Sequence, residues 1–256
     1  MLSAVAVLGI DASLGRLDYT SLSPQALMES LIGGFDEVGS ICGSREEPKD
    51  LAEWEGVTVE EDLMVKVIDW SEMSLSGSFD VQWAPPSIIT MDIGGNLLGG
   101  SLQMEKLPEK LQFLFLDTNA FTGSVNLTQL PACLNRLNLY KNQLSGSVDL
   151  RKLPVKMTKL YLNSNAFTGP VDLTSLPDGM KRLRLDRNKF SGEVSFEKLP
   201  ASISLLQLSY TNLRGEYNVR DFTGHIRVSH SNIIEHRDYE SNDAFWWSDR
   251  DEDDSG

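Results

Sequence analysis

The stretch LQFLFLDTNAFTGSVNLTQLP, residues 111–131, decides the fold of this chain, because its pattern returns every 23 residues. Glycine recurs at this spacing seven times and asparagine five times, and a Leu-Pro pair closes most of the units. The glycines are Gly77, Gly100, Gly123, Gly146, Gly169, Gly192 and Gly215, and the asparagines are Asn96, Asn119, Asn142, Asn165 and Asn188. A fixed period of this length predicts stacked units, each of which buries its apolar face against its neighbours.

Each repeated residue type has a physical role in such a stack. The alternation of apolar and other residues after Leu111 predicts a short strand with one buried face, and stacking would pair these strands in a parallel sheet. The asparagine amide can satisfy backbone groups of adjacent coils, and the glycine permits a bend that other residues resist. The Leu-Pro step favours extended backbone over a full helix on the opposite side. There the pattern predicts extended or short helical segments, or a second small sheet at residues 125–127, 148–150, 171–173 and 194–196.

The unit resembles the L-x-x-L-x-L-x-x-N-x-L signature of leucine-rich repeats, and five near-perfect copies follow one another. Its consensus, with G-x-V-D-L-x-x-L-P, looks most like the leucine-rich-repeat proteins of unicellular eukaryotes, flagellate protists among them. Trp54, Gly56 and Val57 resemble the N-terminal cap of plant-type repeats, C-x-W-x-G-V-x-C, but Ala52 and Val59 replace its two cysteines. The resemblance covers residues 22–236. It implies a solenoid with a parallel sheet on its concave face that serves as a scaffold for protein interactions.

Three regions are expected along the chain. Residues 1–64 form an acidic N-terminal cap region, in which a helix begins after Ser23-Pro24 and ends at Gly33-Gly34. Residues 65–236 form the solenoid, with about eight units of which the first and last are degenerate. Residues 237–256 form an acidic C-terminal tail.

The charge distribution and the missing motifs exclude several classes of function. The net charge of −14 divides into −10 over residues 1–64, +3 over residues 65–237 and −7 over residues 238–256, which disfavours nucleic acid as a partner. No apolar run is long enough for a membrane span. We find no P-loop, G-x-S-x-G or H-E-x-x-H motif, and interpret the three histidines as a polar terminal strand. The sequence therefore predicts a protein that is not an enzyme and uses no metal or cofactor.

The residues that vary between units point to the binding surface. Arg136, Lys159 and Arg182 occupy one position of successive strands, and strands lie about 4.8 Å apart, so a basic column is expected. Exposed aromatic residues beside arginine are typical of interface hot spots. The predicted partner-binding residues are Phe113, Phe115, Arg136, Tyr140, Lys141, Lys159, Tyr161, Arg182, Arg184 and Arg187. Such a patch suits an acidic segment of a partner protein; the alternative is a face that is merely well solvated.

The tail could itself be such a segment. It is acidic and carries Phe245, Trp246 and Trp247, which solvating tails rarely do. We interpret it as a docking motif for another protein or as a clamp that docks on this chain's own face. The alternative is a C-terminal cap whose aromatic residues pack on the last strand.

The cellular location is predicted from the cysteines and the start of the chain. The chain has two cysteines, Cys42 and Cys133, and residues 1–10 lack the positive region of a signal peptide. We therefore expect a cytoplasmic protein, with a secreted or cell-surface recognition module as the alternative. Asn126-Leu127-Thr128 is the only glycosylation sequon, and it falls within the repeat consensus.

Overall fold

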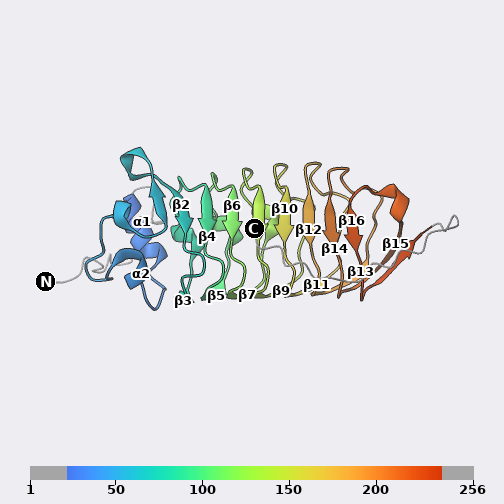
Figure 1. Ribbon diagram of the computed structural model, residues 1–256, viewed down its shortest axis with the longest axis horizontal. Helices are drawn as coiled ribbons and strands as arrows, with labels where there is room; N and C mark the ends of the chain where they lie inside the picture. Colours follow the sequence, from blue (N-terminus) through green and yellow to red (C-terminus); the bar gives the residue numbers. More distant parts are fainter. Residues whose placement is uncertain (1–21, 238–256) are drawn as a thin grey trace, which may run out of the picture.

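The computed structural model describes residues 22–237 and shows a solenoid whose coils stack in a row along the long axis of the molecule (Figure 1). The predicted fold class is confirmed: the solenoid has parallel strands in about eight coils, and it has few helices. Residues 1–10, considered above as a signal, and the tail residues Phe245, Trp246 and Trp247 lie outside the described residues.

One sheet runs the length of the solenoid and has nine strands within the described part of the chain. In each middle strand the central residue is buried and its two neighbours are half-buried, which is the alternation expected of a strand with one face on the core. In spatial order the strands are β1 (Val57–Val59), β2 (Val65–Asp69), β4 (Thr90–Asp92), β6 (Phe113–Phe115), β8 (Arg136–Asn138), β10 (Lys159–Tyr161), β12 (Arg182–Arg184), β14 (Leu205–Gln207) and β16 (His225–Arg227). All neighbours are parallel except β1 and β2.

A second sheet of eight described strands lies along the lower edge of the solenoid in Figure 1. Its strands are β3 (Ser76–Ser78), β5 (Leu97–Ser101), β7 (Ala120–Gly123), β9 (Gln143–Gly146), β11 (Ala166–Gly169), β13 (Lys189–Glu193), β15 (Asn212–Asn218) and β17 (Asn232–His236). The sequence prediction placed this sheet wrongly, at residues 125–127, 148–150, 171–173 and 194–196. The middle strands end instead at or just after a glycine with positive φ, such as Gly123 at 82°.

A short 3-10 turn overlaps one of the expected strands, at Leu127, and a side-chain cap precedes this turn. Residues 127–129 form η6 (Leu127–Gln129), where the Asn126 Oδ1 accepts the Thr128 N–H at 3.0 Å. Once a side chain caps the backbone in this way, the N–H no longer pairs with the next coil. The other turns are η2 (Leu51–Glu53), η3 (Glu61–Leu63), η4 (Val81–Trp83), η5 (Met104–Lys106) and η7 (Val219–Asp221).

The predicted asparagine ladder is confirmed. The Asn142 Oδ1 accepts the Phe121 N–H at 3.0 Å, and its Nδ2 donates to the Leu116 carbonyl at 3.0 Å, so one amide joins two coils. The other four asparagines make the same kind of contacts. The ladder satisfies backbone groups that the turn would otherwise bury unpaired.

The N-terminal end is covered by α1 (Pro24–Leu31) and α2 (Gly39–Cys42). Helix α1 begins as predicted, with the Ser23 Oγ accepting the Ala26 N–H at 3.2 Å. Trp54 and Trp70 are both buried, and the Trp70 Nε1 donates to the Glu55 carbonyl at 2.8 Å. Both cysteines are free thiols, and burial raises the pKa of Cys42.

Candidate partner-binding face

The parallel register of the long sheet brings the predicted basic column together. Phe113 pairs with Arg136, Arg136 with Lys159 and Lys159 with Arg182, so these side chains follow one line across β6, β8, β10 and β12. A second line holds Phe115, Asn138, Tyr161 and Arg184 in the same order. All eight side chains are half-buried on the outer face of the sheet.

Within this face the cations contact aromatic rings and carboxylates. The Arg136 guanidinium lies 5.5 Å from the centroid of the Phe113 ring, close enough for a cation–π interaction. Its Nε is buried and has no hydrogen-bond partner among the described residues. The Arg184 Nε lies 3.4 Å from the Asp186 Oδ1, and burial raises the pKa of Asp186 against the opposing effect of Arg184.

The remaining predicted residues follow the strands at the edge of the face. Tyr140 and Lys141 come after β8 and are exposed, and Arg187 comes after β12 and is also exposed. Lys141 and Arg187 both have a φ of 53°, in the left-handed region, so the backbone holds them at equivalent points of their coils. The structure thus places all ten predicted residues on or beside β6, β8, β10 and β12.

Sequence reasoning missed a stack that extends this edge. The Arg187 guanidinium lies 4.7 Å from the Tyr210 ring centroid, and the Tyr210 and His230 rings are stacked at 4.3 Å. Tyr210 and His230 also have positive φ, at 55° each, and stand where Arg187 stands in the earlier coil. That shared position was visible in the sequence, but His230 was interpreted only as part of a polar strand.

The opposite end of the same face is acidic. Asp92 lies on β4 in line with Asp69 on β2. Burial raises the pKa of Asp92, the hydrogen bond from the Gly94 N–H lowers it, and the negative charge of Asp69 raises it further. Burial and then Asp92 raise the pKa of Asp117, whose Oδ1 accepts a hydrogen bond from the Asn138 Nδ2 at 2.7 Å. The face therefore changes from acidic at β2 and β4 to basic at β8 to β12.

Asn163 lies within this face, at the edge of the basic patch, and is 1% exposed. Its Oδ1 and Nδ2 both lack a hydrogen-bond partner within residues 22–237. In the same described range no three His, Cys, Asp or Glu side chains converge in a way that could hold a metal ion.

No family model and no curated protein matches the sequence, but solved structures match the fold. One is a pollen receptor kinase 3, with 21% identity and a TM-score of 0.57, covering 85% of this chain and 99% of that one. A second is the plant peptide hormone receptor RGFR1 in complex with RGF2, with 28% identity and a TM-score of 0.53, covering 62% of this chain and 27% of that one.

A third is the leucine-rich-repeat ectodomain of the membrane receptor kinase GASSHO1/SCHENGEN3 from Arabidopsis thaliana in complex with CASPARIAN STRIP INTEGRITY FACTOR 2. It has 17% identity and a TM-score of 0.50, covering 83% of this chain and 33% of that one. This chain thus spans about a third or less of the length of the last two receptors. Among the described residues no helix is both long and apolar enough to cross a membrane. The chain has the fold of a leucine-rich-repeat solenoid.

Proposed function

We propose that this chain is a non-catalytic scaffold that binds an acidic, aromatic segment of a partner protein along the exposed face of the long sheet. The observation that carries the proposal is the register that lines up Arg136, Lys159 and Arg182 next to Phe113. Two of the structures with the same fold are receptors in complex with another molecule, RGF2 or CASPARIAN STRIP INTEGRITY FACTOR 2. Their ligands support a binding role here and do not name the partner.

The chemistry of the face suits such a segment. Arginine offers planar donors that match carboxylates, and the half-buried rings of Phe113, Phe115 and Tyr161 offer apolar area with little conformational entropy to lose. The acidic end at Asp69 and Asp92 would repel the same segment, so a bound acidic peptide is expected to lie over β8 to β12.

The chain's own tail provides a defined probe. A labelled peptide of residues 238–256 is titrated against a chain that ends at residue 237, with and without Arg136→Glu, Lys159→Glu and Arg182→Glu. Reversal of the three charges is expected to weaken binding about 30-fold, since several charge pairs of the exposed kind together contribute about 2 kcal/mol. The loss should shrink as salt is raised, because salt screens these pairs.

The matched control reverses three lysines that precede the Leu-Pro steps on the other side of the coils, Lys106, Lys152 and Lys198. This variant has the same net charge as the first and should bind the peptide nearly as well as the unchanged chain. Equal weakening by both triple variants would mean that only net charge matters, and would reject the proposed face. If the labelled peptide binds the chain that ends at residue 237 but not the full chain, the attached tail already occupies the face, which would favour docking in cis over docking in trans.

We also propose an assignment to the 23-residue class seen in unicellular eukaryotes, and the division into residues 1–64, 65–236 and 237–256. The spacing of the asparagines and glycines supports the assignment to this repeat class.

The predicted location needs revision. The matching structures include receptor ectodomains, which favours the secreted alternative over the cytoplasmic location predicted from the cysteines.

Glycosylation tests the location. The Asn126 side chain is exposed at the start of η6, so it would be accessible to the glycosylation machinery. If the chain is secreted by its native cell, an N-glycan on Asn126 is expected there and should be detected by mass spectrometry before and after enzymatic deglycosylation. Asn126→Asp should abolish the glycan and preserve the fold, because Asp149 and Asp172 cap the equivalent turns. In the native cell, unmodified Asn126 in a recovered cytosolic chain would restore the cytoplasmic prediction.

A further inference from the structure

The last coil of the solenoid is shorter than the others, and this opens a pocket between it and the coil before. The step from Leu205 on β14 to His225 on β16 is three residues shorter than the step from Arg182 on β12 to Leu205. Phe222 and Thr223 stand where the previous coil has Leu199 and Pro200. The chain then passes so close to that coil that a Cβ on Gly224 would lie 2.2 Å from the Ile203 carbonyl oxygen.

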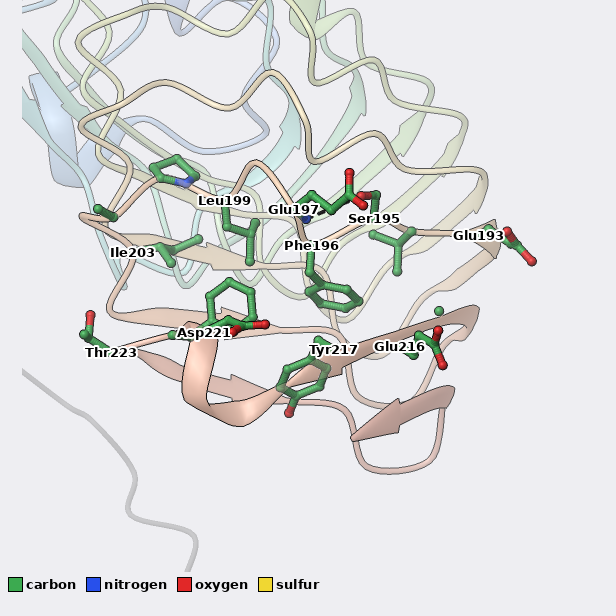
Figure 2. A pocket seen from close by; sticks show the side chains of 15 residues that line it. Glu193, Ser195, Phe196, Glu197, Leu199, Ile203, Glu216, Tyr217, Asp221 and Thr223 are labelled. Carbon is green, nitrogen blue, oxygen red and sulfur yellow. Dashed lines mark hydrogen bonds between the residues drawn. The ribbon is translucent and has the colours of Figure 1, made fainter. Parts of the chain in front are cut away.

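The pocket has a volume of about 620 Å³ and lies between residues 193–203 and residues 215–223 (Figure 2). Its floor is a cluster of three aromatic rings, Phe196, Tyr217 and Phe222, whose centroids are 5.0 to 6.4 Å apart. Phe196 and Tyr217 are nearly buried, whereas Phe222 is half-buried and is the most accessible of the three.

Carboxylates surround this floor. Glu193 and Glu197 come from the penultimate coil, and Glu216 and Asp221 come from the last coil, as Figure 2 shows. All four side chains are exposed, so their charges are at the mouth of the pocket. The His236 Nε2 lies 3.1 Å from the Glu216 Oε2, so a nitrogen-bearing side chain already contacts this rim.

An aromatic floor with a carboxylate rim selects a particular ligand chemistry. Ring faces attract cations, and more strongly when the cation is desolvated, whereas carboxylates at the rim would repel an anionic ligand. A small metal ion would have to shed water for apolar contacts, so an organic cation with alkyl groups matches both parts of the pocket better. The Tyr217 phenol contributes no charge at neutral pH, and burial, followed by the neighbouring Glu235, raises its pKa further, to about 12.

We infer that this terminal-coil pocket, lined by Phe196, Tyr217 and Phe222 and rimmed by Glu193, Glu197, Glu216 and Asp221, binds an organic ammonium group. The group is of the kind carried by a lysine side chain or a quaternary ammonium compound. The site lies on a different part of the solenoid from the proposed partner-binding face, so each can be tested without the other.

The test titrates the full chain with choline and with its neutral isostere 3,3-dimethylbutan-1-ol, by ligand-observed NMR and calorimetry. Choline is expected to bind about tenfold more tightly than the isostere, as a desolvated cation–π contact with nearby carboxylates allows. N-acetyl-lysine methylamide and its trimethylated form then distinguish a protein-borne lysine from a quaternary ammonium source.

Variants separate the two parts of the pocket. Glu197→Gln with Asp221→Asn should weaken choline binding about fivefold and leave the isostere unchanged, and Phe222→Leu should weaken choline at least as much. Glu105→Gln with Glu109→Gln, exposed acids of an earlier coil, serve as the control and should have no effect. Because the rim variants change only exposed side chains, they keep the test valid if Phe222→Leu fails to fold. Equal binding of choline and the isostere, or binding of none of the cations, would overturn the inference.

Discussion

The substitution Gly56→Ala is expected to lower the free energy of unfolding by about 4 kcal/mol or more. Gly56 has a φ of 69°, and an added Cβ would lie 2.0 Å from the Asp69 carbonyl oxygen and 2.9 Å from the Trp70 Cδ1. The obstacle is backbone rather than the end of a flexible side chain. The Asp69 N–H also donates to the Gly56 carbonyl at 2.7 Å, so the two chain segments cannot separate without losing this bond.

Urea unfolding monitored by tryptophan fluorescence measures this loss, since Trp54 and Trp70 are buried close to Gly56. Gly39→Ala is the matched control: Gly39 lies in the cap helix α2, and an added Cβ would have no neighbour within 4 Å. That change is expected to alter stability by about 0.5 kcal/mol at most. If the two variants lower the free energy of unfolding by similar amounts, the close approach between Gly56 and Asp69 does not account for the stability of the cap.

Most of the fold could be predicted from the sequence, because the residues that recur act through local chemistry. The asparagine amides and the buried leucines each serve their own coil and its neighbours, so a repeat in the sequence becomes a repeat in space. The second sheet was predicted in the wrong place for an equally physical reason. Val125 and Leu127 are buried and alternate with exposed residues, as a strand would. The alternation indicates which side chains are buried, whereas strand pairing depends on the backbone. Strand β7 ends at Gly123, where the backbone has a positive φ and bends.

The candidate site could be predicted in part. A constant spacing predicts which residues line up across strands, and the register of β8, β10 and β12 confirms this alignment for Arg136, Lys159 and Arg182. Contacts that depend on side-chain direction could not be predicted, such as the Tyr210–His230 stack. The pocket of the last coil was missed because it arises from a change in coil length. Tyr217 and Phe222 stand where the previous coil has Val194 and Leu199, so the repeat places them near Phe196, but the repeat does not show the gap that the shorter coil leaves beside them.

The second large effect is expected at the asparagine ladder, where Asn165→Ala should destabilise the chain by about 3 kcal/mol. The Asn165 Oδ1 accepts the Leu144 N–H at 3.0 Å, and its Nδ2 donates to the Leu139 carbonyl at 2.8 Å. Alanine would leave the Leu144 N–H without its side-chain partner, and an unpaired buried group costs about 1–3 kcal/mol. The Leu139 carbonyl would lose its shorter hydrogen bond and keep only the one from the Asn142 Nδ2 at 3.3 Å. Urea unfolding followed by circular dichroism should show the loss as a lower midpoint.

Asn163, two residues earlier, provides a control of the same residue type. It is buried as well, but neither end of its amide has a hydrogen-bond partner among the described residues. Asn163→Ala is therefore expected to cost about 1 kcal/mol or less, since it removes a polar group whose burial is uncompensated. A cost for Asn163→Ala as large as that for Asn165→Ala would mean that the volume of the side chain, rather than its hydrogen bonds, holds the coils together. A clear gap between the two would assign that role to the amide ladder, because the two variants delete the same atoms from the same coil.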